Sequence, residues 1–252
     1  MNNEPPKTGP RTVAHVAPLA TFMAFLALPE LLRTAGLAIA DDSAPWWRRQ
    51  PELWTYPVQT VATLLVLLAC RKHYEFRPLS GFALAIGAAA IGIAIWIAPG
   101  FLFDRLGTPS ALLGHLGFVS RTAEYPPYLA DPGQVSLYWL TLGLRLVRLV
   151  IAVPLAEEIF WRGFLMRYLA KPDGDYWTVP FGTFHRQSLL IVTAAFVLIH
   201  ARVDWFPAAV FGLLMYAVAV HTKSLAACVI MHAIANLLLG IYVLATRQWG
   251  YW

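Results

Sequence analysis

Long apolar segments recur along the whole chain, and they constrain the fold more than any other feature of the sequence. A helix needs about 20 mostly apolar residues to cross a bilayer, because lipid offers no hydrogen-bond partner to an open backbone. The candidates lie at residues 14–38, 54–70, 80–98, 134–152, 153–169, 187–201, 205–221 and 223–245. The sequence therefore predicts an all-α, polytopic transmembrane bundle of seven to eight helices.

The composition agrees with a membrane protein. Hydrophobic residues make up 58% of the 252 residues and charged residues only 13%, whereas soluble domains average about 25% charged residues. The net charge of +5 comes from Lys and Arg scattered among loops and helix ends. Without a basic stripe, this charge indicates contact with anionic lipid headgroups and argues against a nucleic-acid partner.

The chain is expected to form one integral bundle in two parts. Residues 1–150 hold the N-terminal transmembrane helices and a polar loop, and residues 151–252 hold the core with the functional motifs. The proline-rich stretch 99–133 is the longest polar connection, and loops of this length are commonly functional or mobile. We expect the first helix to be retained, because the region before the signal-peptidase-like Ala38-Ile39-Ala40 is too long and contains charged residues.

Two adjacent glutamates in an apolar segment are the first candidates for chemistry, since ionisable groups at membrane depth are costly and usually functional. They belong to the pattern Glu157-Glu158-x-x-x-Arg162. Residues four apart share a helix face, so Glu158 is expected to form a structural ion pair with Arg162. Glu157 then has no fixed cation and is the candidate proton acceptor for a water molecule.

Two further apolar helices carry isolated polar side chains. His200 closes the pattern Phe196-x-x-x-His200, and His232-x-x-x-Asn236 places an imidazole and an amide on one face of the last helix. A single buried histidine most often bonds a neighbouring helix. Together with Glu157, these groups have the chemistry to activate a water and to donate to an oxyanion.

Arg145 and Arg148 are three apart and share a helix face. The sequence leaves three roles open for them: pairing with an acidic group such as Glu30, reaching the membrane interface, or binding a headgroup or a substrate carboxylate. The first two are the more usual roles of arginine in a membrane.

The three motifs, in this order and in a chain of this hydrophobicity, resemble those of the CPBP or ABI family of intramembrane proteases. This is the group of type II CAAX prenyl endopeptidases and bacteriocin-processing enzymes, and the resemblance covers about residues 150–240. It implies that Glu157 and His200 activate a water, and that His232 and Asn236 form the oxyanion site. The whole chain also resembles a bacterial subgroup found alongside exosortase-type protein sorting systems.

The resemblance implies a membrane-embedded endopeptidase that hydrolyses a CAAX-type or related membrane-proximal peptide bond. Its substrate would be a membrane-associated peptide or protein, with or without a lipid anchor, and the expected location is a bacterial inner membrane. Family members have also been described as metalloproteases, which makes Glu157, His200 and His232 a candidate set for zinc or another divalent metal. Zinc sites usually have three or four ligands with supporting partners, so we expect glutamate-activated water without an obligatory metal.

Three other functions are open at this point. A non-catalytic membrane scaffold or immunity protein would use the same bundle without hydrolysis. A cysteine protease or transpeptidase would centre on Cys70, beside Arg71 and His73, but no third orienting group is evident. A transporter would use buried carboxylates and histidines as a proton relay, yet the chain lacks paired interrupted helices in two matching halves.

Overall fold

A computed structural model describes residues 9–41, 43–107, 110–126 and 129–252, and within these residues the chain is helical, with no strand. The longer helices are α1 (Gly9–Thr34), α3 (Glu52–Cys70), α4 (Phe82–Leu106), α6 (Val135–Val147), α9 (Arg186–Leu198), α10 (Trp205–Thr222) and α11 (Leu225–Thr246). The shorter ones are α2 (Trp46–Arg49), α5 (Ala111–His115), α7 (Val153–Glu158) and α8 (Met166–Ala170). Single 3-10 turns lie at Arg71–His73, Tyr176–Thr178, Arg202–Asp204 and Trp249–Tyr251.

Within the described part of the chain, six helical segments are long and apolar enough to cross a membrane, and the shorter apolar helix α9 is a seventh. The prediction of an all-α polytopic bundle is thereby confirmed. The count is seven because the segments predicted at 134–152 and 153–169 join in one continuous helix, Val135–Ala170. This helix runs through the predicted division between residues 150 and 151, and the division itself stays a prediction.

Two π-helical segments, Arg148–Ala152 and Ile159–Leu165, separate α6, α7 and α8 within this long helix. In the first, the Val153 N–H donates to the carbonyl of Arg148, five residues back, in place of the usual four. Pro154 follows directly. Because a proline has no N–H and crowds the preceding turn, the wider π turn lets the helix continue past the ring.

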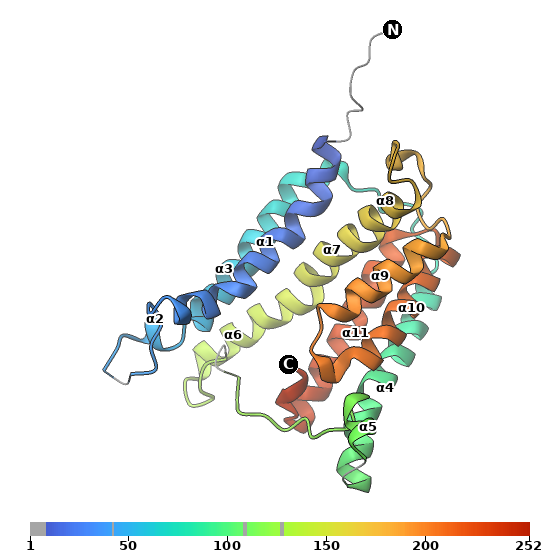
Figure 1. The fold of residues 1–252 in the computed structure, drawn as a ribbon. Coiled ribbons are helices and arrows are strands. Elements are labelled where there is room, and N and C mark those ends of the chain that lie inside the picture. The colour runs from blue at the N-terminus through green and yellow to red at the C-terminus, as the bar shows by residue number, and fades with distance from the viewer. Residues whose placement is uncertain (1–8, 42, 108–109, 127–128) are drawn as a thin grey trace.

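The helices form two groups that diverge from one end of the molecule (Figure 1). In one group α1 packs along α3, which also meets α6. In the other, α4 packs against α10 and α11, and α9 packs against α10. The helix made of α6, α7 and α8 runs diagonally between the groups and contacts both α1 and α11. Residues near its middle are therefore enclosed from two sides.

Small side chains bring the helices of the second group close together. Ala85 and Ala89 of α4, Ala208 of α10 and Ala227 of α11 have no exposed surface. In a bilayer, where lipid tails are as apolar as leucine, helices associate largely through close packing at such small residues. This packing makes the second group a firm support for side chains that project from α11.

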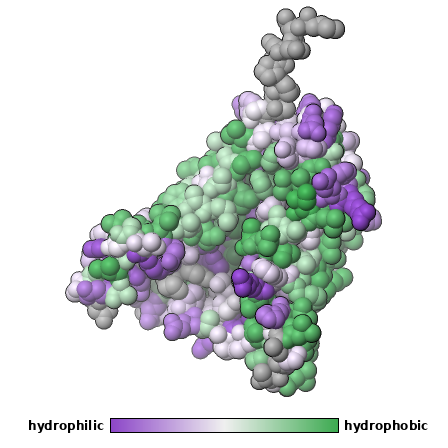
Figure 2. All heavy atoms as spheres, in the orientation of Figure 1, coloured by the Kyte–Doolittle hydropathy of each residue, from purple (hydrophilic) through white to green (hydrophobic). Residues whose placement is uncertain are grey.

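Apolar side chains also cover much of the outer surface. Leu65, Leu84 and Ile91 are each more than half exposed. Figure 2 shows hydrophobic residues across the middle of one face and hydrophilic residues towards its ends, with a hollow between the two groups of helices. An apolar middle between polar ends is the surface that a bilayer-spanning protein needs.

Helix α4 continues beyond its predicted end at residue 98, through Pro99 to Leu106. Neighbouring helices tolerate a proline inside a transmembrane helix because they hold the freed backbone groups. The helix ends at Gly107, whose positive φ of 81° lets its N–H donate back to the carbonyl of Phe103. The polar connection is thus shorter than predicted, and it includes the buried Arg121.

Arg145 and Arg148 face aromatic rings. The guanidinium of Arg148 lies 4.2 Å from the ring centre of Tyr56, and that of Arg145 lies 5.5 Å from the ring centre of Trp252. Glu30, the acidic partner suggested by the sequence, forms its ion pair with another arginine on the surface. Cation–π contacts of this kind stabilise a desolvated guanidinium by about 2 kcal/mol.

Gly92 sets the distance between α4 and α10, because a Cβ there would lie 2.7 Å from the ring of Phe211. We expect Gly92→Ala to lower the free energy of unfolding by about 1–3 kcal/mol through overpacking. Gly87→Ala in the same helix is the matched control, since a Cβ there has no neighbour within 4 Å and alanine favours a helix. Thermal unfolding in detergent checks this, and equal stability of the two variants contradicts it.

Candidate active site

Three of the four predicted catalytic side chains line one cavity of about 180 Å³ inside the bundle. His200 comes from the turn after α9, and His232 and Asn236 come from α11. The apolar and aromatic part of the wall is made by Ile93, Trp96, Phe196, Phe211, Ala235 and Leu239. A cavity of this volume has room for several water molecules, so water can reach both imidazoles.

Glu158 is the carboxylate that contacts the histidine of α11. Its Oε1 accepts a hydrogen bond from Nη1 of Arg162 over 3.1 Å and another from Nδ1 of His232 over 2.8 Å. The side chains of Glu158 and Arg162 are fully buried, and the ion pair expected from their spacing is present. A carboxylate on Nδ1 fixes the orientation and tautomer of the ring and leaves Nε2 for other partners.

Glu157 is buried as well, with 9% of its surface exposed, but it is not among the residues that line this cavity. Its Oε2 has no hydrogen-bond partner among the described residues. Consecutive residues diverge by about 100° around a helix, so Glu157 points to a different side from Glu158. A general base can lie farther from its target in the free protein than in a complex, and the role of Glu157 stays a prediction.

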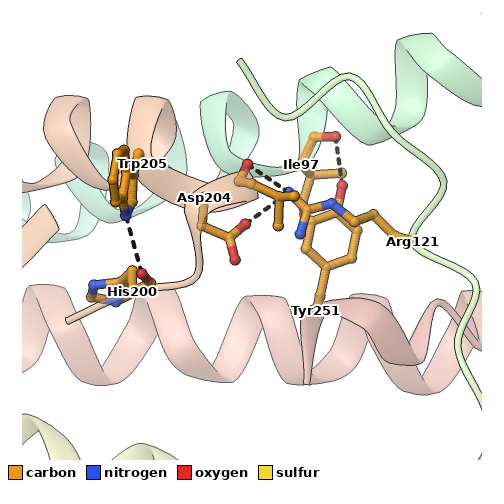
Figure 3. A network of polar contacts seen from close by, with 7 residues as sticks. Ile97, Arg121, His200, Asp204, Trp205 and Tyr251 are labelled. Carbon is orange, nitrogen blue, oxygen red and sulfur yellow. Dashed lines mark hydrogen bonds and ion pairs between the residues drawn. The ribbon is translucent and has the colours of Figure 1, made fainter. Parts of the chain in front are cut away.

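His200 is fixed through its Nδ1, which donates to the carbonyl of Phe196 over 2.7 Å. Its ring packs against the rings of Phe196 and Trp96, with centroids 4.6 and 5.4 Å away. The indole of Trp205 donates to the backbone carbonyl of His200 (Figure 3). Since Nδ1 carries the hydrogen, Nε2 of the neutral ring is an acceptor. In both histidines Nδ1 is hydrogen-bonded to the protein, and Nε2 is left for a partner in the cavity.

Asn236 pairs with a backbone carbonyl that Pro154 leaves without a donor. In the π register of Arg148–Ala152, the carbonyl of Leu149 would pair with the amide of residue 154, which has no N–H. Nδ2 of Asn236 donates to this carbonyl over 2.8 Å. The bond joins α11 to the long helix at the cavity, and the second amide hydrogen of Asn236 is left for another acceptor.

Two polar side chains in the cavity wall, Asp204 and Tyr251, were missed by reasoning from the sequence. Asp204 accepts a hydrogen bond from Nη2 of Arg121 over 2.7 Å, and the Tyr251 hydroxyl donates to the carbonyl of Ile97 over 3.1 Å (Figure 3). Burial raises the pKa of Tyr251 to about 12, so the hydroxyl keeps its proton at neutral pH. Its position four residues after His200 was the one signal in the sequence that could have placed Asp204 near the site.

The candidate metal ligands Glu157, His200 and His232 are not grouped as a metal site. Among the residues that the structure describes, no three His, Cys, Asp or Glu side chains lie together as metal ligands would. A catalytic zinc usually takes three protein ligands, and Glu157, the third member of the predicted set, does not line the cavity with the two histidines. In this conformation the described side chains therefore do not form the three-ligand set of a catalytic zinc.

The fold and the cavity define a class of protein, a polytopic helical membrane protein with histidine and amide side chains gathered at an internal cavity. Residues 139–238 match the family described as Type II CAAX prenyl endopeptidase Rce1-like. This region holds all three motifs, and its likeness to the CAAX protease family supports the resemblance that the motifs indicated. No curated protein and no solved structure matches the chain. The likeness to the exosortase-linked subgroup stays a prediction.

The likeness to this family supports a general activity, proteolysis at the membrane. The six apolar helices found among the described residues make the chain an integral membrane protein. Cys70, the centre of the cysteine-protease alternative, lies at the end of α3 and is not among the residues that line the cavity.

We expect the hydrogen bond from Asn236 to the Leu149 carbonyl to contribute more to the free energy of unfolding when residue 154 is a proline than when it is an alanine. Asn236→Leu removes the donor and leaves a buried carbonyl unpaired, which lowers the free energy of unfolding by about 1–3 kcal/mol. With Pro154→Ala, a backbone N–H becomes available to that carbonyl, so the same substitution should cost less. A double-mutant cycle on thermal stability in detergent measures the difference, and equal costs in the two backgrounds contradict this account.

Proposed function

We propose that this protein is an endopeptidase of the bacterial inner membrane that cleaves a membrane-proximal peptide bond, of CAAX type or related, by direct attack of water. The observation that carries the proposal is the single cavity lined by His200, His232 and Asn236, which come from two separate motifs. The cavity lies among helices with apolar outer faces, which suits a substrate held in or near the bilayer.

In the proposed reaction a water in the cavity donates a hydrogen bond to Nε2 of His200 and loses a proton to Glu157, whose side chain turns towards the cavity in the complex with substrate. The water oxygen attacks the peptide carbonyl carbon, and the carbonyl oxygen becomes an oxyanion. The spare amide hydrogen of Asn236 donates to that oxyanion, as does Nε2 of His232 when its ring carries both protons. The C–N bond then breaks, and the leaving amine takes the proton from Glu157, which restores the carboxylate.

Glu158 supports this reaction without touching the substrate. Its Oε1 orients His232 and pairs with Arg162. Removing one partner of a buried ion pair leaves an uncompensated charge and costs about 3–5 kcal/mol. Loss of activity in a Glu158 variant therefore follows from the structure even without a chemical role, and Glu157 gives the sharper test.

Glu157→Gln is expected to lower cleavage at least about 100-fold, because the amide keeps the shape of the side chain but cannot accept the proton. Its thermal stability should stay near that of the wild type. The matched variant Glu158→Gln should lose both cleavage and stability, since Arg162 loses its carboxylate. Comparative proteomics of membrane fractions should show one precursor accumulating with Glu157→Gln, and that precursor then serves as the substrate for rate measurements in detergent.

Two results would count against this assignment. Wild-type cleavage by Glu157→Gln would mean that another group takes the proton, such as Nε2 of His200. If no precursor accumulates with Glu157→Gln, His200→Gln or His232→Gln, the hydrolase proposal fails and the scaffold or immunity alternative is favoured.

Treatment with a chelator is expected to leave cleavage unchanged, because the side chains do not form a three-ligand metal site. The check is the cleavage rate of the accumulated precursor after the detergent-purified protein has been treated with EDTA and desalted. Activity that disappears on chelation and returns with added zinc would identify a metalloprotease and overturn the metal-free mechanism.

A further inference from the structure

One carboxylate lines the cavity, and it belongs to none of the three motifs. Among the described residues of the cavity wall, Asp204 is the only acid. Its side chain is 15% exposed, and its Oδ1 is the oxygen that binds Arg121. Figure 3 shows the other oxygen directed away from Arg121. Asp204 therefore has an unshared carboxylate oxygen at the cavity that both imidazoles reach.

Arg121 supplies the positive charge that this carboxylate needs. Its side chain is 2% exposed, and its Nη2 donates both to Asp204 Oδ1, over 2.7 Å, and to the carbonyl of Val203, over 3.1 Å. The ring of Tyr251 covers the guanidinium, with its centre 4.5 Å away. The desolvation of a buried ion pair often outweighs its attraction, so stability alone is a weak reason for placing this pair beside the cavity.

Segments from distant parts of the chain hold this pair in one place. A Cβ at Gly100 of α4 would collide with the Tyr251 hydroxyl and the Arg121 side chain. A Cβ at Gly250 would collide with the backbone of Arg121, whose carbonyl accepts a hydrogen bond from the Gly250 N–H over 2.7 Å. Close packing of this kind leaves Arg121, and hence Asp204, little freedom to move.

We propose that Asp204 is a further catalytic residue of this site, whose unshared carboxylate oxygen accepts a hydrogen bond from the attacking water and holds it beside His200. This inference rests on the hydrolytic function proposed above. Neither Glu157 nor Glu158 lines the cavity, and Glu158 is occupied by its own partners. Asp204 is thus the carboxylate that lines the cavity among the described residues, and Arg121 is a positioning residue that acts through it.

The test compares Asp204→Asn with a double variant that has no charge at this position. Asp204→Asn should lower kcat about 100-fold, because a misplaced reactant costs about that factor, with little change in KM. It also leaves the buried guanidinium of Arg121 without a carboxylate, so its thermal stability should fall. The double variant Arg121→Gln, Asp204→Asn should regain stability while its kcat stays about 100-fold low.

The matched control is Asp104→Asn. Asp104 also ties the C-terminal segment to α4, through a 2.6 Å hydrogen bond from Gln248, but it does so on the exposed surface. This variant should cleave the precursor at the wild-type rate. A second catalytic variant, Asp204→Glu, keeps the charge pair and moves the oxygen by one methylene, so it should fold and still have a lowered kcat.

If the double variant cleaves at the wild-type rate, the proposal is wrong and the pair of Arg121 and Asp204 is only structural. Cleavage at the wild-type rate by Asp204→Glu would lead to the same conclusion. Glu157→Gln and His232→Gln run in parallel to separate this inference from the function on which it rests. If they lose cleavage while the double variant keeps it, only the role of Asp204 is wrong. If cleavage survives in all of them, the reaction does not take place at this cavity, and the role of Asp204 fails with the site. If the wild-type protein itself cleaves no precursor, the hydrolytic function fails.

Discussion

The rest of the site depends on the hydrogen bonds that the buried carboxylate of Glu158 accepts from Arg162 and His232. A charge without exposed surface has to be paired, and one oxygen serves both Arg162 on its own helix and His232 on α11. The same contact sets the spacing between the long helix and α11 and aims the imidazole. It also decides where Glu157 points, because neighbouring residues on a helix cannot face the same side.

The backbone of the long helix imposes a second constraint on how this helix packs against α11. Pro154 and the π turn before it leave the carbonyl of Leu149 in need of a donor, and Asn236 supplies one. His232 and Asn236, four residues apart on α11, therefore both bind the long helix, one at Glu158 and the other at Leu149. Residues that the motif assigns to chemistry also fix the frame in which that chemistry takes place.

The cavity is completed by residues outside the region that matches the family. His200, Asp204, His232 and Asn236 lie within residues 139–238, whereas Trp96 and Tyr251 of the wall come from segments before and after it. Arg121, which binds Asp204, also precedes the matched region. The matched region thus supplies the candidate catalytic groups, and the flanking segments supply other parts of the cavity wall.

The sequence alone determined the apolar segments that form the helices and the pairing of Glu158 with Arg162, because hydrophobic length and helical period act within a single segment. It also singled out His200, His232 and Asn236 as polar groups that lipid would not accept. It did not show that the segments 134–152 and 153–169 join in one helix. Only the tertiary structure decided that Glu158 turns to α11, that Asn236 bonds a carbonyl left open by a proline, and that Asp204 joins the cavity. Each of these contacts depends on which faces of separate helices meet. The hydrophobic periodicity of a single segment does not determine which helix packs against which face.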